Sequence, residues 1–185
     1  YLGVMAGWAT VDAAMAKPAL RGFIDGLLRD EVEPTLSGVV VPPGYRERLL
    51  QRFANPALAH RCAQIAMDGS QKLPQRWLNT VRDRVAAGAP IDRLALALAA
   101  WVMHLRSQPV DDPLAEPLQA LHARAMAKPT ARERAAEVTR FAPVFGELAG
   151  EPRLIEALAL ALDGLQTRGV VAAMERCTHA RDPLT

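Results

Sequence analysis

The sequence predicts an all-α fold. Apolar residues recur at helical spacing along most of the chain, as they do between Leu20 and Leu28. Prolines and capping residues mark the starts of these segments, and glycines mark several of their ends. The one β-branched run, Val39 to Val41, is bracketed by glycine and proline, so it is too short and isolated to build a sheet. We therefore expect a multi-helical protein in which any sheet lies outside this sequence.

The N-terminal half divides into five predicted helices. Their expected spans are residues 11–16, 18–32, 45–53, 56–68 and 70–87, with an extended connector over 37–44. Thr10 and Ser70 are capping residues before the first and fifth helices, and Pro18 begins the second. Gly69 is expected to end the fourth helix in the left-handed conformation that glycine tolerates. Pro74 stays within the first turn of the fifth helix, where its missing N–H does no harm.

The C-terminal half is also helical, and its first helix is the expected centre of the fold. Residues 91–105 are apolar nearly all round, which is typical of a helix buried on every side. Later helices are expected at 115–127, 130–141, 145–149, 151–165 and 170–177, most of them beginning near a proline. The polar tail over 179–185 is predicted to be loose.

Length, charge and cysteine content narrow the class of protein. With 185 residues, of which 50% are hydrophobic, the chain is long enough for one domain with a sizeable core. Its 22 Lys and Arg against 20 Asp and Glu provide no basic surface for nucleic acid or an anionic membrane. No apolar run approaches the ~18 residues of a membrane span. Cys62 and Cys177 stand far apart, so we expect two buried free thiols in a soluble cytoplasmic protein.

No self-sufficient catalytic motif is visible. The sequence lacks a G-x-G-x-x-G loop, a Walker loop, a G-x-S-x-G elbow and any His or Cys pair at metal-ligand spacing. We therefore expect no bound metal. His104 falls at the end of the predicted buried helix, where a structural role is expected. His60 precedes Arg61 on a segment that leads into the M-D-G-S-Q-K stretch, so it is a candidate to line a site.

Lys72 occupies an unusual position for a cation. It falls in the first turn of the helix expected after Gly69, where the helix dipole disfavours positive charge and favours an anion. An oxygen-rich ligand at that helix start, bearing sugar hydroxyls or a carboxylate, would suit the lysine. The alternative is a solvated surface lysine paired with Asp68. The residues themselves leave both interpretations open.

Four stretches together resemble a known family. They are Y-L-G at residues 1–3, T-V-D-A-A-M at 10–15, R-F-A-N-P at 52–56 and I-A-M-D-G-S-Q-K-L-P at 65–74. The combination is similar to the C-terminal domain of the long-chain mannitol dehydrogenase family, over essentially the whole chain. The resemblance implies that residues 1–185 are the helical substrate-binding domain of a two-domain oxidoreductase. A preceding nucleotide-binding domain would hold NAD or NADP.

The resemblance also implies roles for particular residues. Lys72 matches a lysine that contacts the substrate in relatives, and Gln64 occupies the position eight residues earlier that is often arginine. Asp68 would shape the turn between them, and His60 remains a candidate to line the site. The family's catalytic motif, K-x4-N-x2-H, falls just before Tyr1. No catalytic residue is therefore expected in this sequence, and the chain alone should be inactive.

The implied reaction interconverts a hexitol or a hexonate and its 2-keto sugar by hydride transfer with NAD or NADP. Mannitol with fructose and mannonate with fructuronate both remain open, because a neutral Gln64 does not by itself favour a carboxylated substrate. A protein of a different class also stays open, a helical interaction module that binds a partner protein through an apolar face. A G-x-G-type βαβ unit and the K-x4-N-x2-H motif encoded upstream would favour the enzyme.

Overall fold

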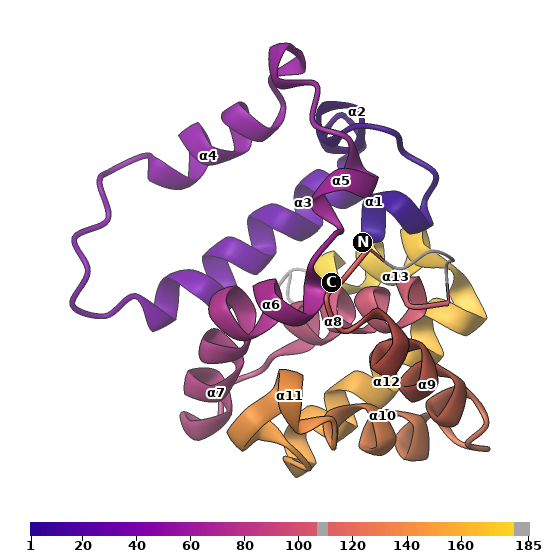
Figure 1. The fold of residues 1–185 in the computed structure, drawn as a ribbon. Helices are drawn as coiled ribbons and strands as arrows, with labels where there is room; N and C mark the ends of the chain where they lie inside the picture. Colours follow the sequence, from indigo (N-terminus) through magenta and orange to yellow (C-terminus); the bar gives the residue numbers. More distant parts are fainter. Residues whose placement is uncertain (107–110, 180–185) are drawn as a thin grey trace.

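The computed structural model describes residues 1–106 and 111–179 as a set of packed helices (Figure 1). Within these ranges there is no strand, and the only extended pairing is one antiparallel bridge between Thr10 and Arg61. The all-α prediction is confirmed. The α-helices are α1 (Leu2–Met5), α2 (Val11–Met15), α3 (Pro18–Leu27), α4 (Tyr45–Phe53), α5 (Cys62–Ile65), α6 (Gly69–Leu73), α7 (Asn79–Ala86), α8 (Asp92–His104), α9 (Ala115–Met126), α10 (Ala131–Thr139), α11 (Ala142–Phe145), α12 (Pro152–Arg168) and α13 (Val170–His179).

Shorter turns extend or join these helices. A π turn over Leu28–Val32 continues α3, and a second over Pro74–Leu78 joins α6 to α7. The 3₁₀ turns are Glu33–Thr35, Pro56–Leu58 and Gly146–Leu148. Helix α4 has the predicted bounds, and residues 37–44 before it form no regular structure. The bounds of α4 are confirmed, whereas the predicted extended connector contains turns at residues 37–38 and 43–44.

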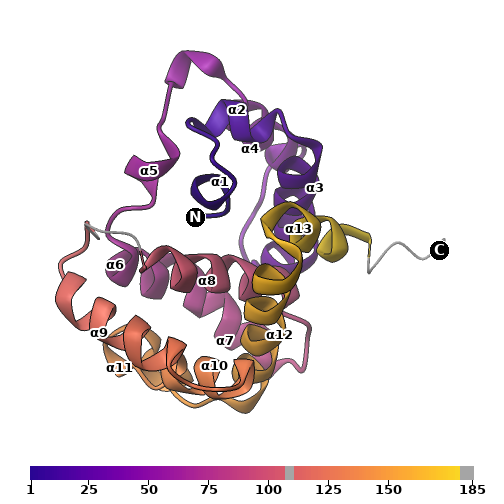
Figure 2. The ribbon, with the colours of Figure 1, turned by 90° about the vertical axis from the view of Figure 1, so that its right-hand side faces the viewer.

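Helix α8 is the centre of the fold, as predicted. Every residue from Arg93 to Val102 is buried, because α1, α3, α12 and α13 all pack against this helix (Figure 2). Burying a leucine side chain contributes roughly 1.5–3 kcal/mol, so this helix supplies much of the hydrophobic stabilisation. Helix α10 packs against α9 and α12 and completes the lower layer in Figure 2.

A buried carboxylate fixes the start of α8. Glu31, in the π turn after α3, is fully buried and accepts hydrogen bonds from the backbone N–H groups of Arg93 and Leu94, both at 2.9 Å. The first N–H groups of a helix have no partner within the helix, and a carboxylate there also complements the helix dipole. The Arg93 guanidinium lies 3.0 Å from Asp30 and presses against Gly26, where a Cβ would meet it at 2.7 Å. These contacts join α3 to the central helix.

The predicted helix over 56–68 is wrong. Pro56 begins only a 3₁₀ turn, which Ala59 ends with a φ of 45°. His60 and its neighbour are extended and pair with the N-terminal segment: the His60 carbonyl accepts from Val11, and Cys62 N–H donates to Ala9, both at 2.9 Å. Backbone pairing with a distant segment has overridden the helical spacing of the apolar residues. The short helix α5 is what remains of the predicted helix.

The predicted boundary at Gly69 and Ser70 is also wrong. Asp68, and not Gly69, has the left-handed backbone conformation, with a φ of 56°. Gly69 begins α6, so Ser70 lies inside the helix and does not cap it with its own side chain. Pro74 consequently falls in the second turn, where the helix widens into the π turn. The wider turn accommodates a residue that cannot donate the ordinary hydrogen bond.

The C-terminal predictions need smaller corrections. Helix α11 begins at Ala142, before the predicted 145–149 segment, and α12 continues to Arg168. Thr130 and Glu133 form a capping box at the start of α10. Both cysteines are free, but Cys177 is half-buried rather than buried. Of the predicted tail, residues 180–185 lie outside the described residues.

Candidate functional site

The turn between α5 and α6 is the candidate site, because it contains Asp68 and leads directly into the part of α6 that carries Lys72. Helix α5 ends at Ile65, and three residues separate it from Gly69, where α6 begins. The last of them, Asp68, has the left-handed backbone conformation, which is uncommon for a residue with a side chain. Its backbone N–H donates to the carbonyl of Asp111 at 2.9 Å, and its carbonyl accepts from Lys72 N–H at 2.9 Å. The turn is thus tied both to a distant segment and to the helix that follows it.

The Lys72 ammonium reaches back across this turn. Nζ donates to the carbonyl oxygen of Met67 at 2.7 Å and to that of Ile65 at 3.3 Å, and it lies 3.7 Å from the Asp68 carboxylate. The last carbonyls of a helix have no partner within the helix and carry partial negative charge. The cation is therefore placed at the end of α5 as much as at the start of α6. Its side chain is 30% exposed, so solvent or a ligand can reach it.

Asp112 caps the start of α6 from outside the helix. Its carboxylate accepts from the backbone N–H of Ser70 at 2.8 Å and from the Ser70 hydroxyl at 2.5 Å. The same carboxylate accepts from Leu114 N–H at 2.9 Å, just before α9. A helix start ordinarily leaves its first N–H groups free for a ligand. The N–H of Ser70 is not free, because Asp112 already accepts it.

Two aromatic side chains close over Gly69. A Cβ at this position would lie 2.5 Å from Trp101 Nε1 and 2.7 Å from the Tyr1 hydroxyl, so only glycine fits without a shift. The Tyr1 ring meets Trp77 edge to face at 6.2 Å and His104 at 5.5 Å between ring centres. These contacts fix the position of α6 against α8.

Burial around Tyr1 sets the protonation of two neighbouring side chains. Burial raises the pKa of the Tyr1 phenol well above its usual value, and the negative charges of Asp112 and Asp68 raise it further. The phenol therefore stays protonated and can donate a hydrogen bond. Burial lowers the pKa of His104, so its imidazole is neutral at pH 7.

A cavity of about 500 Å³, lined by both polar and apolar residues, lies beside the turn. Gln64 and Arg61 line it from the α5 side, and His104 lines it from α8. The carboxyl-bearing residues Asp111 and Asp112 complete its wall. The predicted residue Gln64 is exposed here and can meet a ligand that enters this cavity.

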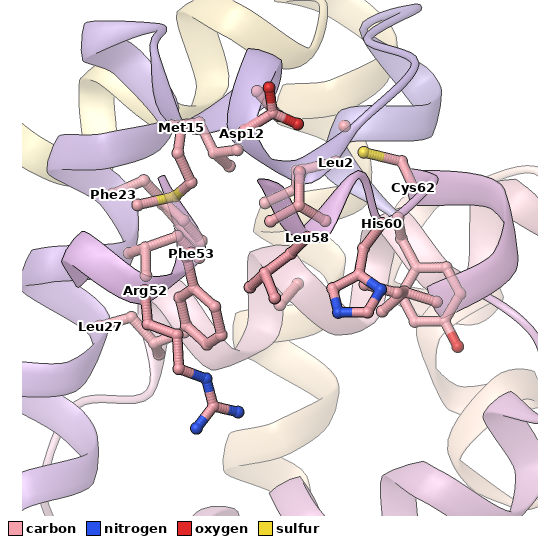
Figure 3. Close-up of a pocket in the computed structure, with 18 of the residues that line it drawn as sticks. Leu2, Asp12, Met15, Phe23, Leu27, Arg52, Phe53, Leu58, His60 and Cys62 are labelled. Carbon is pink, nitrogen blue, oxygen red and sulfur yellow. The ribbon is translucent and has the colours of Figure 1, made fainter. Parts of the chain in front are cut away.

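A second cavity, of about 370 Å³, is mainly apolar and lies between α2, α3 and the segment over 52–62. Met15, Phe23 and Phe53 form one side, and His60 lies on the other with Leu58 between (Figure 3). His60 therefore lines a cavity, but a different one from that of Gln64. Lys72 is among the lining residues of neither cavity.

The structure thus brings together only part of the predicted set. Lys72 and Asp68 form an ion pair, Gln64 lies on α5 at the cavity beside the turn, and His60 lies apart on the extended segment. Sequence reasoning missed Asp112 and Tyr1. The signal for Asp112 was present, since an aspartate just before a proline is a common helix cap. Its contact with Ser70, 42 residues away, had no signal in the sequence.

The described residues contain neither a membrane-spanning helix nor a cluster of metal ligands. In the ranges 1–106 and 111–179, no helix combines the length and the apolar character needed to cross a bilayer. Over the same residues, no three His, Cys, Asp or Glu side chains gather as metal ligands.

Comparison with known proteins identifies close relatives. The mannitol 2-dehydrogenase of Pyrenophora tritici-repentis is 31% identical over 186 residues, which covers 95% of this chain and 31% of that protein. The D-mannonate oxidoreductase of Escherichia coli is 43% identical over 117 residues, or 60% of this chain and 23% of that protein. This chain spans about a third or less of either relative.

A solved structure shows the same fold. It is the mannitol 2-dehydrogenase of Pseudomonas fluorescens in a ternary complex with NAD and D-mannitol, with a TM-score of 0.86 at 25% identity. The match covers 96% of this chain and 37% of that protein. Residues 1–166 also match the mannitol dehydrogenase C-terminal domain family as a whole. The resemblance noted in the sequence is confirmed, and the chain belongs to the mannitol dehydrogenase C-terminal domain family.

Proposed function

We propose that residues 1–185 are the substrate-binding domain of an NAD- or NADP-dependent oxidoreductase that interconverts a hexitol or hexonate and its 2-keto sugar. The observation that carries this proposal is the fit of nearly the whole chain to a mannitol 2-dehydrogenase solved with NAD and D-mannitol. Membership in a family of enzymes argues against the alternative of a helical interaction module. A cytoplasmic enzyme without a metal is part of the proposal.

The dinucleotide is held outside the described residues in this proposal. Those residues contain no sheet and no glycine-rich βαβ loop of the kind that binds a dinucleotide diphosphate. The cofactor supplies or accepts the hydride when it is bound by a further domain. By the family resemblance, proton transfer belongs to the lysine of the K-x4-N-x2-H motif, before Tyr1. The described residues therefore bind and orient the sugar.

Lys72 is the residue best placed for this role. An ammonium has three N–H donors, and two of them are directed at the carbonyls of Ile65 and Met67. The third is available to a sugar hydroxyl or carboxylate, with Asp68 as its partner in the absence of ligand. Because two donors are fixed, the ammonium is held in place before the substrate arrives. Holding the chain of hydroxyls positions the reacting carbon, and such placement contributes much of an enzyme's rate.

Gln64 is proposed to contact the substrate from the other side of the turn. Its amide can donate to and accept from hydroxyls, and its exposed side chain lines the cavity beside the turn. Because the amide carries no charge, it selects neither a hexitol nor a hexonate by electrostatics. The relatives include both mannitol 2-dehydrogenases and a D-mannonate oxidoreductase. Both substrate pairs are therefore proposed for testing.

A direct assay tests the proposal. The full-length protein is mixed with NADH or NADPH and either fructose or fructuronate, and oxidation of the cofactor is followed by its absorbance. The reverse reaction uses mannitol or mannonate with NAD or NADP. We expect turnover of at least one of the two pairs. Failure of both pairs with both cofactors, in a folded protein, contradicts the proposed function.

A further inference from the structure

The position of the Lys72 ammonium depends on the turn that it spans. Two of its contacts are backbone carbonyls of that turn, from Ile65 and Met67. If the turn shifts relative to α6, these carbonyls move and the ammonium moves with them. Whatever fixes the turn therefore also fixes the cation.

The segment containing Asp111 and Asp112 holds this turn from outside. The Asp111 carbonyl accepts from Asp68 N–H, on one side of Gly69. The Asp112 carboxylate accepts from the N–H and the hydroxyl of Ser70, on the other side. Asp111 and Asp112 thus bind the residues on both sides of Gly69, the first residue of α6.

Asp112 is itself held firmly. It accepts from Leu114 N–H, which anchors the carboxylate to the start of α9. Tyr1 and Trp101 press on Gly69 and leave no room for α6 to slide toward α8. Ser70 is 5% exposed, so water competes little for its contacts with Asp112. These contacts fix the position of α6, the helix that carries Lys72.

We propose that Asp112 is a positioning residue of the sugar site, which holds α6 through Ser70 so that Lys72 meets the substrate in the productive geometry. This inference rests on the proposed function, in which Lys72 contacts the sugar. Asp112 itself does not need to touch the substrate or the cofactor in this role.

Steady-state kinetics of the full-length enzyme test the inference. Asp112→Ala removes the acceptors for Ser70, and we expect the KM for the sugar to rise roughly tenfold, because small misplacements of binding groups are costly. The KM for the dinucleotide should not change. Asp112→Asn should largely restore the sugar KM, because an amide oxygen can still accept the Ser70 N–H and asparagine is an equally good cap.

A matched control separates positioning from general stability. Thr130→Ala removes the side-chain cap of α10, where the Thr130 hydroxyl accepts from Glu133 N–H at 3.2 Å. It also weakens one helix start by loss of a cap, but in a helix that does not carry Lys72. We expect a fall in Tm comparable to that of Asp112→Ala with no change in the sugar KM. An equal rise in KM for Thr130→Ala would overturn the inference.

A double variant tests whether Asp112 acts through Lys72. If it does, Asp112→Ala should raise the sugar KM much less in a Lys72→Ala background than in the wild type. Independent, multiplicative effects would overturn the inference. If Asp112→Ala does not fold, Ser70→Ala removes only the hydroxyl contact and should raise the sugar KM by a smaller factor, and an unchanged KM would count against the inference.

The two levels of the proposal fail in different ways. A folded wild-type enzyme with no activity on either sugar pair contradicts the proposed function itself. An active wild type whose sugar KM rises in Lys72→Ala but not in Asp112→Ala leaves the function standing and overturns only the role of Asp112.

Discussion

The Lys72 ammonium lies 2.7 Å from the carbonyl oxygen of Met67, at the opposite end of the turn from its own backbone. This contact explains how a cation is accommodated within the short helix α6, of which Lys72 is the fourth residue. The ammonium is placed against two carbonyl oxygens, that of Met67 in the turn and that of Ile65 at the end of α5, whose partial negative charges favour a cation. A lysine held in this way has a fixed position and a remaining donor, which are the properties that a substrate-orienting residue requires.

Replacement of Lys72 by alanine tests this role. In the full-length enzyme we expect Lys72→Ala to raise the sugar KM at least about tenfold, since hydrogen bonds to charged groups contribute roughly 1.5–3 kcal/mol. The KM for NADH or NADPH should stay the same. Lys17→Ala, which removes an exposed lysine before α3, is the control and should change neither constant. An unchanged sugar KM in Lys72→Ala would show that this lysine is only structural.

Gly69 should tolerate no side chain. Gly69→Ala places a Cβ 2.5 Å from Trp101 Nε1, and overpacking of this kind costs about 1–3 kcal/mol. Gly22→Ala, within helix α3, is the matched control. Its Cβ would meet Thr178 at 3.5 Å, an ordinary van der Waals distance. There the lower entropy of the unfolded chain should stabilise the protein slightly. Chemical denaturation checks both, and equal free energies of unfolding for the two variants would contradict the packing argument.

Those parts of the fold that local patterns determine were predictable. Helix α8 is buried on all sides because its residues are apolar all round, and this is visible in a single segment. The start of α10 depends on Thr130 and Glu133, which are three residues apart. Family resemblance added Lys72, whose type and spacing match a motif. Each of these signals is contained within a few residues.

Those parts that depend on distant partners were not predictable. The segment before α5 is extended because it pairs with residues 9–11, which no local pattern reveals. Position 69 must be glycine because Tyr1 and Trp101 leave no room for a Cβ there. From the sequence alone, this glycine looked like one that ends a helix. Ser70 looked like a cap, yet it donates hydrogen bonds to Asp112, which follows α8 in the sequence. In each case a tertiary contact replaced the local preference.

Glu31 should be among the most sensitive positions for stability. Glu31→Ala leaves the N–H groups of Arg93 and Leu94 buried without this acceptor, and each unsatisfied donor costs about 1–3 kcal/mol. We expect a loss of roughly 3 kcal/mol in the free energy of unfolding. As a control, Glu156→Ala removes an exposed carboxylate on α12. It should change the free energy of unfolding by less than about 0.5 kcal/mol. Urea denaturation at pH 7 measures both, and similar midpoints would rule out a capping role for Glu31.

His122 should make stability depend on pH below neutrality. Burial, and to a smaller extent the charge of Arg106, lower the pKa of His122 in the folded protein from its ordinary value of 6.5. Below pH 6.5, His122 is therefore protonated to a greater extent in the unfolded chain than in the folded protein. The free energy of unfolding consequently falls as the pH falls. Above about pH 7.5 this histidine is neutral in both states and contributes no slope.

The His122→Leu variant isolates this contribution. Leucine removes the titrating ring, including a buried Nε2 that has no hydrogen-bond partner among the described residues. We expect the loss of stability between pH 7.5 and pH 5.5 to be smaller in the variant than in the wild type, as measured by urea midpoints at both values. The difference between the two proteins at pH 7.5 serves as the reference, since it reports packing alone. If both proteins lose the same stability on acidification, His122 does not resist protonation in the fold, and the acid sensitivity must come from other groups.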